Sequence, residues 1–197
     1  PQSLIARGET VSEYRLLGPL LPELDIFLTS LDEARLIENT IDRPRTWEEG
    51  TLERDMARFL DMLTDRYWKD SGRTRLFGIT VHDGAWYKSL VPGGEGTPCR
   101  TTQSAFMFGE VIDLVGAGDS FRAGLIAHIA QNIDAFRSGA LRFEEAVQMG
   151  NLFASLYIKA PLQNRYAYIQ PYEQLVPFLT PERHYHTFEG MLNDLLS

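Results

Sequence analysis

The chain of 197 residues carries a formal net charge of -8, and 44% of its residues are hydrophobic and 23% charged. This composition is that of a globular protein and excludes a disordered or collagen-like chain. The acidic charge argues against sequence-independent binding to nucleic acid, which requires a basic face. Because the sequence contains neither a run of about 18 apolar residues nor a signal-peptide pattern, we expect no membrane partner and a cytoplasmic location. The single cysteine, Cys99, excludes an internal disulfide and a paired-cysteine zinc site.

The first part of the chain predicts a strand that leads into a helix. Residues 1–23 show little pattern, and we expect a loop or a loose helix there. Residues 24–29 form a short apolar run of the kind found in buried parallel strands. Ser30 and Glu33 have the spacing of a capping box, which predicts a helix with Ser30 as its N-cap and its end near Asn39.

The middle of the chain predicts an amphipathic helix and two neighbouring strands. Over residues 47–68 apolar side chains recur every three or four positions, as on a surface helix of an α/β layer. Residues 75–81 and 85–91 are expected to form buried strands joined by a turn at residues 82–84. Residues 92–97 are rich in glycine and predict a flexible loop.

The last part of the chain predicts mainly helices. Residues 106–112 are expected to add a short strand, whereas residues 118–132 and 143–159 predict two longer helices with apolar faces. Two short closing helices are expected at residues 172–179 and 187–196. Since no repeat and no long linker divides the sequence, the pattern favours one α/β domain.

The segment from Asp113 to Gly124, DLVGAGDSFRAG, has the composition of an anion-binding turn. Gly116 and Gly118 flank a small alanine, so the backbone can adopt conformations in which successive N–H groups converge at the start of a helix. The helix dipole adds partial positive charge at the same place. Such a cradle can hold phosphate oxygens without a lysine, of which the sequence has only three.

Asp119 falls in the first turn of that helix, where the dipole favours its ionised form. A carboxylate beside an anion site can act as a general base toward an incoming hydroxyl, which is an arrangement for phosphoryl transfer. The residues alone leave a second interpretation open, in which the segment is a tight strand-to-helix turn and Asp119 is its N-cap.

The same segment resembles the C-terminal signature of the ribokinase-like (PfkB) family of carbohydrate and nucleoside kinases, which reads D-T-T-G-A-G-D-S/T-F-x-x-G. The sequence departs from it only at Leu114 and Val115, where the family has threonines. The resemblance extends over roughly residues 20–179. The signature positions that match are Asp113, Gly116, Ala117, Gly118, Asp119, Ser120, Phe121 and Gly124.

The resemblance implies a role for each part of the signature. Asp119 would be the base that takes the proton of the acceptor hydroxyl. The amides of Gly116, Ala117 and Gly118 would stabilise charge on the transferred phosphoryl group. Asp113 would be a ligand of a structural monovalent cation, K⁺.

Three further landmarks of the family occur in the expected order. Glu33 stands in the family's N-x-x-E motif, with Ser30 in place of the asparagine, and would act on Mg²⁺ from its outer shell. That role is compatible with a capping box. Thr80 and Gly84 correspond to the nucleotide loop T-x-G-x-x-G, and Asn151 lies at a helix position that reaches the adenine base.

The resemblance implies a three-layer αβα sandwich with a mostly parallel sheet, formed as a single ribokinase-like domain over residues 1–197. The implied activity is ATP-dependent phosphoryl transfer to a hydroxyl of a small sugar or sugar acid. ATP, Mg²⁺ and K⁺ are the implied cofactors, and a homodimer is a further expectation. The family's acceptor-binding strands and β lid precede the matched region. We therefore expect them to be absent from this chain, which begins at Pro1 without an initiator methionine.

Two alternatives stay open at this point. The first is a nucleoside kinase of the adenosine type, because acceptor selectivity resides in the part expected to be absent. The second is a non-catalytic ATP-binding or truncated family member. This second alternative is motivated by Ser30, by His82 in place of the first loop glycine, and by residues 159–162, which replace the family's R-x-G-A turn.

Overall fold

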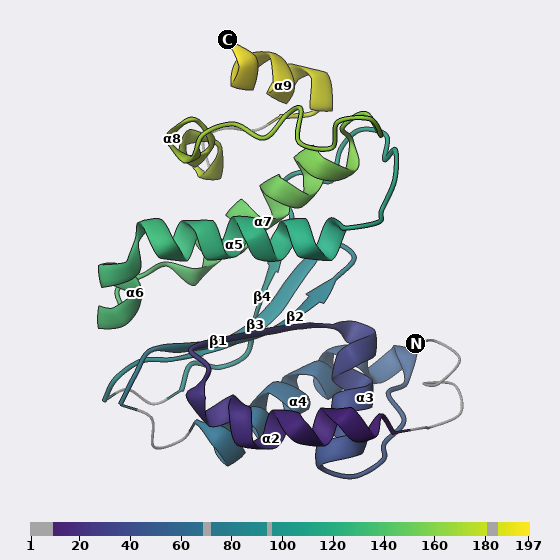
Figure 1. The fold of residues 1–197 in the computed structure, drawn as a ribbon, viewed down its shortest axis with the longest axis vertical. Helices are drawn as coiled ribbons and strands as arrows, with labels where there is room; N and C mark the ends of the chain where they lie inside the picture. Colours follow the sequence, from purple (N-terminus) through teal and green to yellow (C-terminus); the bar gives the residue numbers. More distant parts are fainter. Residues whose placement is uncertain (1–9, 69–71, 94–95, 181–184) are drawn as a thin grey trace. The chain divides into compact units, whose positions relative to one another are not determined.

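The computed structural model describes residues 10–68, 72–93, 96–180 and 185–197. The chain divides into two compact units (Figure 1). The first consists of residues up to Thr101 together with 137–139, and the second of residues 102–136 and 140–197. The single domain expected from the sequence remains a prediction, and each unit is described by itself.

The first unit is built on a mixed sheet with the strand order β1-β2-β3-β4. Strand β2 pairs in parallel with β1 and antiparallel with β3. The expected mostly parallel sheet is therefore wrong, because the short turn at His82 and Asp83 joins β2 directly to β3, and a tight hairpin makes its strands antiparallel. Strand β4 was not predicted. The strands are β1 (Ile26–Ser30), β2 (Arg75–Val81), β3 (Gly84–Leu90) and β4 (Arg100–Gln103).

Two helices, α3 (Leu31–Ile41) and α4 (Leu52–Tyr67), pack against strands of the first unit (Figure 1). The predicted capping box opens α3: the Glu33 N–H donates to Ser30 Oγ (3.3 Å), and the Ser30 N–H donates to Glu33 Oε2 (2.9 Å). The apolar stripe that predicted α4 is buried, as expected for a helix that covers a sheet. Short turns surround these helices, namely η1 (Ser12–Leu16), α2 (Leu17–Leu20), η2 (Leu21–Glu23) and η3 (Glu49–Thr51).

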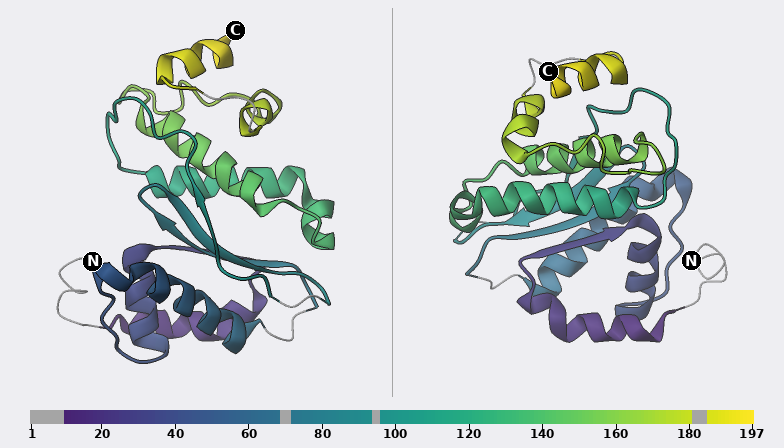
Figure 2. Two further views of the ribbon diagram at one scale, coloured as in Figure 1. Left: turned by 180° about the vertical axis from the view of Figure 1, so that it is seen from behind. Right: turned by 45° about the horizontal axis from the view of Figure 1, so that its top comes forward.

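The second unit is helical, and its two long helices α5 and α7 lie side by side (Figures 1 and 2). Glycines make this close approach possible. A Cβ atom at Gly124 would lie 2.7 Å from the Met149 carbonyl oxygen, and one at Gly150 would lie 2.8 Å from the Phe121 ring. The last glycine of the signature, Gly124, therefore serves helix packing. The elements are α5 (Ala117–Gln131), α6 (Ile133–Ser138), α7 (Phe143–Ile158), α8 (Tyr172–Leu175), η4 (Val176–Leu179) and α9 (Phe188–Leu196).

Residues 106–112, expected to form a strand, form a loop instead. Gly109 has a φ of +85°, which interrupts an extended backbone. The Phe106 carbonyl accepts hydrogen bonds from side chains of α7 and its C-cap rather than from a strand. The prediction was wrong because only Phe106 of this apolar run is buried, in a cluster with residues of α7, whereas Met107, Val111 and Ile112 are exposed. A short apolar run does not by itself distinguish a strand from a loop segment that packs against a helix. In the described ranges, no helix combines the length and apolar character needed to cross a membrane.

Candidate functional site

The glycine-rich turn of the signature ends at the N-terminus of α5, with Gly116 as the N-cap. Gly116 has a φ of +87°, in the left-handed region that favours glycine. A Cβ atom there would lie 2.9 Å from two atoms of the Tyr157 ring and hydroxyl. Two hydrogen bonds close the turn: the Val115 N–H donates to Asp113 Oδ1 (3.1 Å), and the Ala117 N–H donates to the Leu114 carbonyl (3.1 Å).

The first turn of α5 offers backbone N–H groups to an anion. Helix geometry leaves the first N–H groups without a partner inside the helix. The Ala117 N–H is already used in the turn, and the Ser120 N–H donates to the Gly116 carbonyl (2.9 Å). The N–H groups of Gly118 and Asp119 are the ones that this geometry leaves for an anion, at the positive end of the helix dipole.

The Asp119 carboxylate is 86% exposed and forms an ion pair with Arg122 Nη1 at 3.0 Å. It borders a hollow of about 360 Å³ in the second unit. Its lining combines residues at the polar start of α5 with aromatic and apolar side chains, a combination typical of small-molecule sites. The lining residues are Gly116, Asp119, Ser120, Ala123, Phe153, Tyr157, Tyr166 and Ile169.

Asp113, Arg165 and two tyrosines form a network of contacts beside the turn. The Asp113 carboxylate forms an ion pair with Arg165, whose guanidinium lies 5.4 Å from the centre of the Tyr157 ring. The rings of Tyr157 and Tyr166 are 5.5 Å apart. Sequence analysis did not identify Tyr157, Arg165 or Tyr166, because nothing in their local pattern connects them with a turn more than 40 residues earlier.

The expected magnesium and nucleotide residues Glu33, Thr80 and Gly84 belong to the first unit. Glu33 Oε2 accepts hydrogen bonds from the Ser30 N–H (2.9 Å), the Ser30 hydroxyl (2.9 Å) and the Thr29 hydroxyl (3.3 Å). Thr80, opposite Ser30 in the sheet, donates from its hydroxyl to the Thr29 carbonyl (3.3 Å). Gly84 pairs with Val81 at the closed end of the hairpin.

In this arrangement Glu33 Oε2 caps helix α3, and we therefore assign Glu33 no role in binding Mg²⁺. Within the described part of the chain, no three His, Cys, Asp or Glu side chains are grouped to hold a metal ion. A magnesium ion bound chiefly by phosphates and water would need no such cluster.

Asn151 is buried in the second unit, where its amide donates to Gln148 Oε1 (3.1 Å). Gln148 in turn donates to the Gln103 carbonyl (2.8 Å) and accepts from the Ala105 N–H (3.3 Å). Asn151 is therefore part of a hydrogen-bond network within the second unit that connects α7 with Gln103 and Ala105. Its expected contact with an adenine base stays a prediction.

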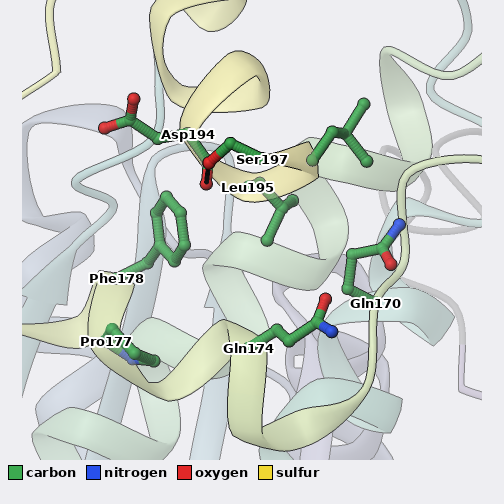
Figure 3. Close-up of a pocket in the computed structure, with 8 residues that line it drawn as sticks. Gln170, Gln174, Pro177, Phe178, Asp194, Leu195 and Ser197 are labelled. Carbon is green, nitrogen blue, oxygen red and sulfur yellow. Dashed lines mark hydrogen bonds between the residues drawn. The ribbon is translucent and has the colours of Figure 1, made fainter.

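A second hollow of about 500 Å³ lies in the same unit. Figure 3 shows the amides of Gln170 and Gln174 on one side of it and residues of α9 on the other. No signature residue lines it, so we do not place the reaction there. The lining residues are Gln170, Gln174, Pro177, Phe178, Asp194, Leu195, Leu196 and Ser197.

Lys159, which follows α7, is a buried cation. Its ammonium donates to the Phe106 carbonyl (2.9 Å) and to Ser155 Oγ (2.6 Å), and it lies 5.4 and 5.1 Å from the ring centres of Phe108 and Phe188. Burial lowers the pKa of this ammonium from 10.5 to about 8. The charged form is therefore less stable in the folded protein than in water.

Stability should consequently rise with pH in a defined window. Between pH of about 8 and 10.5 the unfolded chain binds more protons at Lys159 than the folded chain, so the free energy of unfolding increases through this range. The variant K159M should lack this increase, which amounts to at most about 3 kcal/mol. Urea unfolding of both proteins across pH tests this, with K88M as the control for losing a lysine. Parallel pH profiles for wild type and K159M would contradict the assignment.

Comparison with known proteins identifies related kinases. Residues 82–165 match the model of the pfkB family of carbohydrate kinases. Over 117 residues the chain is 32% identical to 2-dehydro-3-deoxygluconokinase of Bacillus subtilis (strain 168), a match that covers 54% of this chain and 32% of that protein. The chain thus spans about a third of the length of this curated relative.

Solved structures share the fold at low sequence identity. Ribokinase from Cryptococcus neoformans var. grubii serotype A, in complex with ADP, has a TM-score of 0.53 and 16% identity, over 73% of this chain and 44% of that chain. Adenosine kinase from Anopheles gambiae has a TM-score of 0.51 and 15% identity, over 83% of this chain and 46% of that chain. These similarities show a ribokinase-like fold.

Proposed function

We propose that the signature turn is the phosphoryl-transfer site of an ATP-dependent kinase, because residues 82–165 match the model of the pfkB family of carbohydrate kinases. The acceptor is a hydroxyl of a small sugar or sugar acid. The observation that carries this proposal is that the Asp119 carboxylate and the N-terminus of α5 border the same hollow. The sugar-acid kinase of Bacillus subtilis, at 32% identity, supports this acceptor class.

In the proposed reaction, the N–H groups of Gly118 and Asp119 hold the γ-phosphate of ATP at the positive end of the α5 dipole. The Asp119 carboxylate accepts the proton of the acceptor hydroxyl while its oxygen bonds to phosphorus and the bond to ADP breaks. Mg²⁺ bound with ATP supplies positive charge to the phosphates. The exposed ion pair with Arg122 is weak, so the acceptor hydroxyl can displace it.

An acceptor panel tests the proposed function. The chain is incubated with Mg-ATP and sugar acids, neutral sugars or nucleosides, and the phosphate ester is detected by mass spectrometry. We expect phosphorylation of a sugar acid or sugar. Phosphorylation of nucleosides alone would support the adenosine-type alternative, which the solved structures support only at the level of fold. Binding of ATP without any product would indicate a non-catalytic family member.

A further inference from the structure

The oxygens of Asp113 already have donors within the protein. Its Oδ1 accepts the Val115 N–H at 3.1 Å, and its Oδ2 is paired with Arg165 Nη2. Its main-chain carbonyl accepts from Arg165 Nη1 at 3.4 Å. The Asp113 N–H donates to the Ile158 carbonyl at 3.2 Å. The oxygens that a monovalent cation would use as ligands are thus held by N–H groups, and two of them by one guanidinium.

Burial and a contact with an aromatic ring hold the Arg165 guanidinium beside Asp113. Its side chain is only 12% exposed, and its guanidinium lies 5.4 Å from the centre of the Tyr157 ring, which adds a cation–π contact. A guanidinium is charged at every accessible pH, and its planar N–H groups can bind a carboxylate and a carbonyl together. Because the pair is partly buried, salt screens it less than a fully exposed ion pair.

We propose that the Arg165 guanidinium takes the place that the family resemblance assigns to K⁺, and that it positions the phosphate-binding turn without any monovalent cation. A K⁺ ion at Asp113 would have to displace this guanidinium or lie directly against its positive charge. The residues present therefore do not fit a cation site. The positioning role rests on the proposed function, whereas the replacement of K⁺ does not.

Contacts connect Arg165 with the turn in two ways. Through Asp113 it holds the Val115 N–H, in the residue directly before the α5 N-cap. Through Tyr157 it supports the ring that packs against Gly116. It also neutralises the Asp113 carboxylate, which would otherwise repel a phosphate bound at the adjacent helix N-terminus. Arg165 is thus a positioning residue, since it acts through Asp113 and Tyr157.

The first test compares the wild-type chain in potassium chloride and in tetramethylammonium chloride at equal ionic strength. Any ion that binds the folded state raises the thermal midpoint. We expect the thermal midpoint to be the same in both salts, and the Kd for Mg-ATP to agree within about twofold. A clear rise of the midpoint in potassium, or Mg-ATP binding about tenfold tighter, would overturn the proposal. The thermal midpoint tests the replacement of K⁺ even if the chain binds no ATP. Failure to bind ATP would count against the proposed function and not against this replacement.

The second test removes the guanidinium. In tetramethylammonium, R165A should have a lower thermal midpoint and bind Mg-ATP about tenfold more weakly than wild type. Potassium or guanidinium ions should restore both, but not in the double variant D113N/R165A. The exposed arginine Arg142, in the same unit, supplies the control R142A. The proposal would be overturned if R165A had the same thermal midpoint and Kd for Mg-ATP as R142A in both salts. It would also be overturned if neither potassium nor guanidinium ions restored these two quantities in R165A. R165K keeps the positive charge but lacks the planar guanidinium, so its thermal midpoint and its affinity for Mg-ATP should lie between those of wild type and R165A. If R165A does not fold, R165K takes its place in this test.

Discussion

Replacing Asp119 with asparagine is expected to lower turnover by about two to four orders of magnitude, the usual contribution of a general base. Asparagine has the same shape but cannot accept the proton of the acceptor hydroxyl. The Gly118 and Asp119 N–H groups belong to the backbone, so the variant keeps them, and its Kd for Mg-ATP should stay within about twofold of wild type. Steady-state kinetics with the best acceptor and calorimetry with Mg-ATP measure the two quantities.

A matched control is available in the next helix. Asp134 is also an exposed aspartate in the first turn of a helix, α6, and it does not line the hollow. The variant D134N removes the same charge from the first turn of a helix but away from the hollow, so its turnover should equal that of wild type. Equal turnover in D119N and wild type would remove Asp119 from the role of base.

The second large effect is expected from G116A. Alanine at a φ of +87° costs about 1–2 kcal/mol. Its Cβ atom would also lie 2.9 Å from Tyr157, so the tyrosine or the turn must move. We expect a lower free energy of unfolding and Mg-ATP binding at least about tenfold weaker, because the N–H groups lose their common direction. Urea unfolding and calorimetry measure these changes.

Gly118 supplies the control for this substitution. It has no left-handed backbone conformation, and the nearest neighbour of an added Cβ atom, Arg122 Nη1, is 3.8 Å away. Alanine is favoured over glycine inside a helix by about 1 kcal/mol. The free energy of unfolding of G118A should therefore equal or exceed that of wild type. If G116A is as stable as G118A, the turn does not depend on the glycine conformation described here.

Local sequence patterns predicted much of the fold. The capping box of Ser30 and Glu33 is present because both of its hydrogen bonds lie within four residues. The buried stripe of α4 and the hairpin of β2 and β3 likewise depend on neighbours in sequence. Helix α6 and strand β4 are short, and neither has enough periodicity to be recognised.

The candidate site was predicted only in part, for a physical reason. Gly116 and Asp119 were identified because the turn and the helix start are continuous in sequence. The partners that hold this turn, Tyr157 and Arg165, come from the end of α7 and the loop after it, and only tertiary packing brings them to it. The same packing placed a guanidinium at Asp113, where the family resemblance implied a metal ion.

The most direct test of the central claim is a titration of the ¹⁵N-labelled chain with Mg-ATP, followed by two-dimensional NMR. If the phosphates bind at the N-terminus of α5, the amide resonances of Gly118 and Asp119 should show the largest shifts, and G116A should greatly reduce them. Saturable binding that leaves these two resonances unchanged while others move would place the nucleotide elsewhere and contradict the account.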